Sequence, residues 1–344
     1  MIPLLSAGAV SILVSGFGTP ILLRWLIRWR IGQQIRVDGP AHHTLKAGTP
    51  TMGGIAILLA VVAGYFLGHV GTSAPFTRSA LLVLAAIVAA GAVGAADDWI
   101  KVSRRRSLGL NKRWKTLGLV GVAVAFCVAE VNWGSVHTTL SFTRYDLPGA
   151  ELGAVGWVIW GTVIIYGTAN SVNLTDGLDG LAAGSAAFVC GFLALVGFIQ
   201  YRHPGIYGVH AALDLALVAV SMGGACVGFL WWNAAPARIF MGDTGSLGIG
   251  AAIAVLALLE NVDLLLPIAG GLFVIEALSV IIQVASFRLA HRRVFRMAPI
   301  HHHFELLGWP ETTVIVRFWI LAGLFTALGL GVFYADFVAR GAGG

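Results

Sequence analysis

Ten apolar runs of 15 to 26 residues constrain this chain more than any other feature of its sequence. A helix needs about 20 apolar residues to cross a bilayer. The composition agrees, because 58% of the residues are hydrophobic and 11% are charged, against roughly 25% charged in soluble domains. These values exclude a soluble enzyme, a disordered chain and a secreted disulfide scaffold. The sequence therefore predicts an all-α integral membrane protein of about ten spans, at 3–27, 53–70, 79–96, 117–131, 155–172, 181–200, 213–231, 244–259, 264–287 and 313–338.

The basic residues predict which side of the membrane each connection occupies. Sixteen of the 22 Lys and Arg residues fall in connections after odd-numbered spans, and four fall in the other connections or at the C-terminal end. Because cytoplasmic loops are enriched in Lys and Arg, we expect the odd connections to be cytoplasmic and both termini to lie on the non-cytoplasmic side. The net charge of +6 then reflects membrane topology and does not indicate nucleic-acid binding.

No connection is long enough to fold alone, so we expect a single polytopic membrane domain over residues 1–344. The longest outer connection, residues 132–154, alternates apolar residues at Leu140, Phe142 and Tyr145, which favours a small hairpin between spans four and five. The cysteines have no metal-ligand or redox spacing and are interpreted as packing residues: Cys127, Cys190 and Cys226.

Carboxylates gather at the cytoplasmic ends of several spans, where polar residues are costly and usually functional. Asp97 and Asp98 end span three, although adjacent carboxylates repel each other and a helix C-terminus disfavours negative charge. A solvated helix end is the plain alternative. The pair is better explained by metal or proton chemistry, since it is placed against both effects.

Two further acidic segments lie on the same side. The stretch from Asn173 to Gly180 carries Asp176 and Asp179 and reads in part as an Asp/Gly turn between helices, but it also offers many hydrogen-bond partners to a sugar or base. Asp243 opens span eight, where it could cap the helix or bind Mg²⁺, a hard cation that takes carboxylate oxygen. Asn233 and Phe240 upstream add an amide and an aromatic face.

Basic and polar side chains complete the inventory. His301, His302 and His303 cannot all point the same way on a helix and have no cysteine beside them, so phosphate contact or proton transfer is favoured over zinc. The glycine-rich segment after Lys46, which includes Thr51, could hold phosphate without being a Walker sequence. The lysines between positions 101 and 115 are explained mainly by the enrichment of basic residues in cytoplasmic loops. Glu276 and Gln283 lie within span nine, where a structural hydrogen bond and a functional role are equally consistent with the sequence.

These motifs together resemble the phospho-N-acetylmuramoyl-pentapeptide transferase family, one branch of the polyprenyl-phosphate N-acetylhexosamine-1-phosphate transferases. The resemblance is carried by His43-x-x-Lys46-x-Gly-Thr-Pro-Thr-Met-Gly-Gly54, Asp97-Asp98, Asn173-Leu-Thr-Asp-Gly-Leu-Asp-Gly180, Asn233, Phe240-Met-Gly-Asp243 and His301-His-His-Phe-Glu305-x-x-Gly-Trp-Pro-Glu311. The Gly-Thr-Pro-Thr-Met-Gly-Gly stretch and the triple histidine with Gly-Trp-Pro-Glu point to the muramoyl branch.

The resemblance implies a Mg²⁺-dependent transfer of phospho-N-acetylmuramoyl-pentapeptide from its UDP carrier to undecaprenyl phosphate, which releases UMP and forms lipid I. It implies an enzyme of peptidoglycan synthesis in the bacterial cytoplasmic membrane, with its site facing the cytoplasm, and it suggests a homodimer. Asp243 would bind the metal and Asp97 and Asp98 would surround the reacting phosphates, with Asp98 as base or nucleophile and His302 as a further catalytic group. Substrate contacts are expected from Lys46, Thr51, Lys101, Lys115, Asn173, Asp176, Asp179, Asn233, Phe240, Gln283, His301 and His303.

Several alternatives stay open at this stage. A related enzyme could transfer N-acetylhexosamine-1-phosphate in another surface glycan pathway. An ion-coupled transporter or lipid flippase is disfavoured because transporters place ionisable groups near the bilayer midplane, whereas here all but Glu276 cluster at one interface. A zinc protease lacks the His-Glu-x-x-His pattern. Direct attack by the lipid phosphate is weakly favoured over a phosphorylated Asp98 intermediate.

Overall fold

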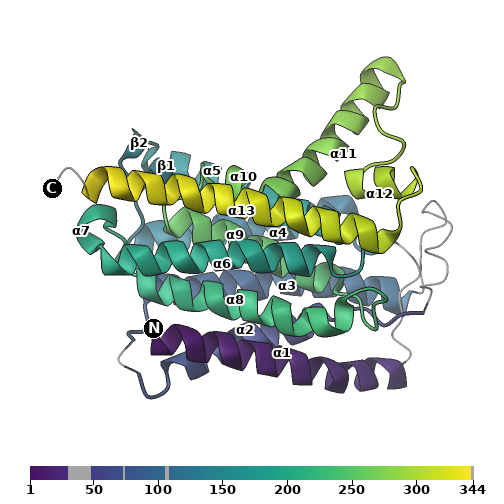
Figure 1. Ribbon diagram of the computed structural model, residues 1–344, viewed down its shortest axis with the longest axis horizontal. Helices are drawn as coiled ribbons and strands as arrows, with labels where there is room; N and C mark the ends of the chain where they lie inside the picture. Colours follow the sequence, from purple (N-terminus) through teal and green to yellow (C-terminus); the bar gives the residue numbers. More distant parts are fainter. Residues whose placement is uncertain (30–47, 73, 105–107, 342–344) are drawn as a thin grey trace.

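The computed structural model describes residues 1–29, 48–72, 74–104 and 108–341, and Lys46 lies outside these ranges. Most helices run side by side along the long axis of the molecule, and both chain ends lie at the same end of the bundle (Figure 1). The elements are α1 (Ile2–Arg28), α2 (Gly54–His69), α3 (Arg78–Ser103), α4 (Lys112–Trp133), β1 (Thr139–Arg144), β2 (Leu147–Glu151), α5 (Gly153–Thr175), α6 (Leu181–Arg202), α7 (Pro204–Tyr207), α8 (Ala212–Asn233), α9 (Gly242–Leu259), α10 (Leu266–Ala269), α11 (Gly271–Ala290), α12 (Ile300–Glu305) and α13 (Glu311–Gly341).

The prediction of an all-α membrane protein is confirmed. Within the described ranges, nine helices are long and apolar enough to cross a membrane, and α2 is a shorter apolar helix of 16 residues. These ten helices follow the order of the ten predicted spans. The apolar side chains form one large cluster that reaches from Leu4 of α1 to Phe333 of α13, and the three cysteines are buried and free, as expected for packing residues.

Helix α9 lies at the centre of the bundle, because 89% of the residues in its 18-residue apolar stretch are buried. Glycines let neighbouring backbones reach it, because a Cβ on Gly94 of α3 would overlap the carbonyl oxygen of Asp243, and a Cβ on Gly54 of α2 would overlap the backbone of Gly245. Small residues at helix contacts permit this kind of close approach in membrane proteins. The start of α9 is thereby held against the inner part of α3.

Two predicted boundaries differ from the structure. Helix α3 continues to Ser103, so Asp97 and Asp98 lie inside its last two turns and not at its end. The apolar signal weakens at these carboxylates while the backbone hydrogen bonds continue, and periodicity alone therefore placed the end too early. The predicted ninth span is divided at Gly270 into α10 and α11, and α11 leaves the bundle at a steep angle (Figure 1).

The hairpin predicted between spans four and five is present, with β1 and β2 paired antiparallel. Its buried side chains on β1 are polar and include Thr139, Ser141 and Thr143, so the alternating apolar residues mark the less buried face. The hairpin is tied to the C-terminal helix by Arg144, whose Nε lies 2.9 Å from Oδ2 of Asp336. It occupies the same end of the bundle as the two chain ends (Figure 1).

Candidate active site

Three carboxylates from two helices converge at the end of the bundle opposite the hairpin. Asp97 and Asp98 come from α3 and Asp243 comes from the first turn of α9, with ligand atoms of all three within 4.8 Å of one another. Asp97 and Asp98 are 3% and 2% exposed, whereas the side chain of Asp243 is 14% exposed. Asp243 is therefore the carboxylate of this group most open to a ligand. Its helix is capped by Met241, so Asp243 is not the N-cap.

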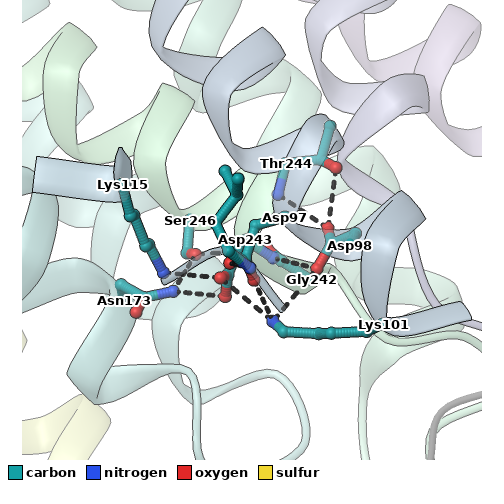
Figure 2. A network of polar contacts seen from close by, with 10 residues as sticks. Asp97, Asp98, Lys101, Lys115, Asn173, Gly242, Asp243, Thr244 and Ser246 are labelled. Atoms are coloured by element: carbon teal, nitrogen blue, oxygen red, sulfur yellow. Dashed lines mark hydrogen bonds and ion pairs between the residues drawn. The ribbon is translucent and has the colours of Figure 1, made fainter. Parts of the chain in front are cut away.

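A lysine ammonium occupies the point on which the three carboxylates converge. Lys101, one helical turn after the pair on α3, places Nζ 2.6 Å from Oδ2 of Asp97, 3.4 Å from Oδ1 of Asp98 and 3.0 Å from Oδ2 of Asp243. Figure 2 shows the lysine reaching across to the acidic groups. One cation thus contacts all three carboxylates.

Asp243 also has partners from two other helices. Nζ of Lys115, from the first turn of α4, lies 2.5 Å from Oδ2 of Asp243. The Nδ2 atom of Asn173, near the end of α5, donates to Oδ1 of Asp243 and to Oγ of Ser246, each at 2.8 Å (Figure 2). Elements α3, α4, α5 and α9 therefore meet at one carboxylate.

Both oxygens of Asp98 accept hydrogen bonds from the start of α9. Oδ2 accepts from the backbone N–H of Thr244 at 2.9 Å and from its hydroxyl at 2.7 Å, while Oδ1 accepts from the N–H of Asp243 at 3.1 Å. Orphan N–H groups in the first turn of a helix are favourable partners for a carboxylate. Asp98 consequently joins α3 to α9.

Asp97 is held differently. Its Oδ1 accepts from the backbone N–H of Leu110 at 2.8 Å. Sequence reasoning did not single out Leu110, Thr244 or Ser246 as part of this network. The hydroxyl groups of Thr244 and Ser246 carried a signal, since they stand one and three residues after Asp243, but a backbone donor such as Leu110 leaves none.

The 176–180 loop, defined as Asp176 to Gly180, connects α5 to α6 beside the carboxylates. Asp176 directly follows α5, and burial, followed by the negative charges of Asp243, Asp98 and Asp179, raises its pKa well above the usual value. Oδ2 of Asp179 accepts from the backbone N–H of Ala237 at 2.9 Å. Asp179 therefore braces the segment after α8.

Other predicted substrate-contact residues organise two loops near the carboxylates. The backbone of Phe240 pairs with the glycine-rich segment, donating to the carbonyl of Pro50 at 2.8 Å and accepting from Gly53 at 2.9 Å. Thr51 is buried and lies beside Asp98, because a Cβ on Gly242 would contact both side chains. Asn233, also buried, donates to the carbonyl of Ile239 at 2.9 Å.

The three histidines of α12 point to three different partners, as their spacing predicts. Nδ1 of His301 lies 3.0 Å from Oε2 of Glu276, and Nδ1 of His302 lies 2.6 Å from Oε2 of Glu305. Nδ1 of His303 accepts from the backbone N–H of Arg296 at 3.1 Å. In the described part of the chain, no direct contact joins these histidines to the three carboxylates.

Gln283 likewise has a local partner. Its side chain accepts from the N–H of Phe295 at 2.9 Å and donates to the carbonyl of Phe295 at 3.0 Å. This closes the segment between α11 and α12. The structure therefore brings six of the predicted residues together: Asp97, Asp98, Lys101, Lys115, Asn173 and Asp243. It places Gln283 on α11 and the three histidines on α12.

The donor set fits a hard divalent cation. All the candidate ligand atoms are carboxylate oxygens, which Mg²⁺ prefers, and the ammonium of Lys101 already occupies a position shared by the three carboxylates. Asp243 is the most accessible of them. The site can therefore neutralise the negative charge of phosphate groups. Two lysine ammonium groups and a divalent cation held by the carboxylates would do so together.

Comparison with known proteins first defines the class. The model for glycosyl transferase family 4 matches residues 80–261, the part of the chain that contributes all three carboxylates. A signature described as phospho-N-acetylmuramoyl-pentapeptide-transferase signature 1 matches residues 46–58.

Full-length relatives then define the branch. The phospho-N-acetylmuramoyl-pentapeptide-transferase of Frankia alni is 50% identical over 98% of this chain and 99% of its own length. The transferase of the same name from Rhodococcus jostii is 48% identical over 98% of both chains, and that of Mycobacteroides abscessus is 48% identical over 97% of both. The chain belongs to the phospho-N-acetylmuramoyl-pentapeptide-transferase family and is a membrane transferase.

Proposed function

We propose that this protein transfers phospho-N-acetylmuramoyl-pentapeptide from its UDP carrier to undecaprenyl phosphate. An oxygen of the lipid phosphate forms a bond to the β-phosphorus of the donor, the bond from that phosphorus to the bridging oxygen breaks, and UMP leaves. The products are lipid I and UMP. The observation that carries the proposal is the meeting of Asp97, Asp98 and Asp243 on the ammonium of Lys101, with the ammonium of Lys115 also beside Asp243.

The charges of the site suit two phosphorylated substrates. Asp97, Asp98 and Asp243 would hold Mg²⁺, which when bound neutralises negative charge on the phosphates and on the departing UMP. Lys101 and Lys115 would then turn from the carboxylates to the phosphate oxygens, since an ammonium binds phosphate as a point charge. Asn173, held 2.8 Å from Asp243, keeps that carboxylate oriented.

The surroundings of Asp98 support direct attack by the lipid phosphate. A carboxylate nucleophile needs an accessible oxygen with a free lone pair aimed at phosphorus. Asp98 is 2% exposed, its two oxygens accept three hydrogen bonds from the start of α9, and the lone pair left on Oδ1 would be a ligand to Mg²⁺. The lipid phosphate is itself an anionic nucleophile, so a covalent step at Asp98 is not required. A phosphorylated Asp98 isolated during a single turnover would contradict this reading.

The membrane arrangement extends the proposal. The excess of Lys and Arg in the odd connections supports a site that faces the cytoplasm, where a water-soluble nucleotide donor would arrive. Both termini would then lie on the opposite side of the bacterial cytoplasmic membrane. A homodimer is proposed from the family resemblance alone.

Release of UMP by the purified protein tests the proposal. Donor and lipid acceptor are supplied together and singly with Mg²⁺, for the wild-type protein and for Asp243→Asn. The expected result is release that requires both substrates, Mg²⁺ and Asp243. Turnover with UDP-N-acetylglucosamine in place of the muramoyl-pentapeptide donor would instead assign another branch of the superfamily. Failure with both donors, from folded protein in lipid, would contradict transferase activity.

A further inference from the structure

A carboxylate and a histidine form an isolated pair beneath the 176–180 loop. Glu276 of α11 and His301 of α12 are both 0% exposed, and Oε2 of Glu276 lies 3.0 Å from Nδ1 of His301. Among the described residues, neither oxygen of Glu276 makes any aligned hydrogen bond. The imidazole is thus the one polar side chain in contact with this carboxylate in the described part of the chain.

Such a pair is costly to bury. Two polar groups lose their hydration, and replacement of buried pairs by apolar residues is often neutral or stabilising. Leu272, one helical turn before Glu276, and Ile300, next to His301, belong to an apolar cluster, and the ring of His302 lies 4.2 Å from that of His301. Stability of the fold therefore does not explain why a carboxylate occupies this position.

The other side of the imidazole touches the 176–180 loop. A Cβ on Gly177 would overlap Nε2 of His301. The backbone φ of Gly177 is not in the left-handed region, so glycine is required there for space and not for conformation. His301 therefore limits how close the loop can come to α12.

The loop is held on two further sides. Leu178 is 2% exposed in the apolar cluster of α11, α12 and α13, and Asp179 accepts from the N–H of Ala237. Asp176, next to Gly177, is close enough to Asp243 and Asp98 for their charges to raise its pKa. A change in the position of His301 would consequently be transmitted to Asp176 over one residue.

We infer that Glu276 is a positioning residue, which orients His301 so that the imidazole sets the position of the 176–180 loop for the nucleotide part of the donor. The contact fixes the ring with Nδ1 toward the carboxylate and Nε2 toward Gly177. Glu276 touches no reacting group and acts only through His301. The inference rests on the proposed function, because its effect is on binding of the UDP-linked donor.

A double-mutant cycle tests this coupling. Glu276→Leu and His301→Phe are each expected to raise the KM for the donor about tenfold, which corresponds to about 1.4 kcal/mol, while kcat falls less than about threefold. The double variant should show no further rise, since both changes remove one contact. Glu276→Gln, which keeps a polar group of the same length beside Nδ1, should restore the KM to within about threefold of wild type.

The matched control is Glu130→Leu. Glu130 is also a fully buried carboxylate in a membrane helix, but it accepts from Ser79 at 2.9 Å near the other end of α3. Its variant should leave the donor KM unchanged. Binding of UMP measured by calorimetry gives a second readout that does not depend on turnover, and it should weaken in Glu276→Leu alone.

The loop side gives an independent variant in case Glu276→Leu does not fold. Gly177→Ala should raise the donor KM by overlap with the imidazole, and it should add no further rise to a His301→Ala chain, in which the loop has already lost this contact. Additive effects in either double-variant comparison, an unchanged KM in Glu276→Leu, or no rescue by Glu276→Gln would each overturn the inference. An inactive wild-type protein would instead contradict the proposed function.

Discussion

Two buried polar clusters of different character lie toward opposite ends of the bundle. At one end, Asp97, Asp98 and Asp243 share the ammonium of Lys101. Near the other end, Asp214 of α8 accepts three hydrogen bonds, all at one oxygen. One oxygen accepts from the N–H of Thr77 at 2.6 Å, from its hydroxyl at 2.7 Å and from the hydroxyl of Tyr65 at 3.1 Å, and the other lies 3.1 Å from Nε2 of His69.

The difference between the two clusters distinguishes a carboxylate that stabilises the fold from carboxylates suited to bind a ligand. Asp214 is one carboxylate with three hydrogen-bond donors at Oδ2 and the imidazole of His69 3.1 Å from Oδ1, so its neighbours compensate its burial. In the first cluster, three carboxylates face two ammonium groups, so the carboxylates outnumber the cations by one. A buried site that retains such an excess is suited to an incoming cation and is a candidate for function.

The largest expected effect comes from exchanging a carboxylate for an amide in each cluster. Asp243→Asn should lower kcat for UMP release by roughly 10³-fold, with little change in the thermal midpoint. Asp214→Asn should leave kcat within about twofold but destabilise the fold by about 1–3 kcal/mol, because it disturbs buried donors. Steady-state kinetics and thermal unfolding of both variants measure this. Equal activity losses in the two variants would remove the distinction between the clusters.

The next effect concerns close packing of α3 on α9. Gly94→Ala should lower activity by about 10- to 100-fold, since the added Cβ overlaps the carbonyl oxygen of Asp243 and misplacement by about 1 Å costs roughly this much. Gly121→Ala in α4 is the control, because nothing lies within 4 Å of the added Cβ. Both variants are assayed for UMP release after their folding is checked by thermal unfolding. An active Gly94→Ala enzyme would show that the carboxylates tolerate a shifted helix.

A smaller effect is expected on the Mg²⁺ requirement when the ammonium of Lys101 is removed. If Lys101 and Mg²⁺ use the same carboxylates, Lys101→Gln should lower the Mg²⁺ concentration for half-maximal activity by about tenfold, although kcat falls. Removal of divalent ions with a chelator should abolish activity in wild type, and added Mg²⁺ should restore it. Titration of UMP release against free Mg²⁺ measures both. An unchanged or higher Mg²⁺ requirement in the variant would place the metal away from Lys101.

The smallest effect is a pH dependence at the far end of the molecule. Asp263 follows α9 and accepts from Nε1 of Trp160 at 2.7 Å, and burial raises the pKa of its carboxyl from 3.8 to about 6. Folding therefore favours the protonated acid, so this contribution to stability is full below about pH 4 and is lost as the pH rises through about 6. Asp263→Asn should remove that part of the change in thermal midpoint between pH 4 and 7. A parallel pH profile for the two proteins would exclude it.

Much of the fold was predictable because it depends on periodic, local signals. Apolar runs identify the ten helices in order, and the alternation of apolar residues identifies the hairpin. The break at Gly270 was missed, since α10 and α11 are both apolar and only their direction differs. The end of α3 was placed too early because charged residues within a helix resemble a helix end.

The site was predictable by residue type more than by contact. Asp97, Asp98 and Asp243 stand out as carboxylates at the ends of apolar runs, and they do come together. That Lys101 reaches all three could not be read from the sequence, since it depends on the crossing of α3 and α9. The position of His301 beneath Gly177 depends on the fold of α11 and α12 as a whole. Lys46 lies outside the described residues, and its role stays a prediction.

The contacts of Lys101 have a consequence for the order in which ligands bind. An internal ammonium holds the three carboxylates together, so the pocket needs no metal to remain assembled. A divalent ion that enters must release this ammonium, and the released group then lacks an anion until a phosphate arrives. Metal and donor should therefore strengthen each other's binding by the same factor, as reciprocal linkage requires. The protein would then respond to the metal–nucleotide complex more strongly than to either part alone.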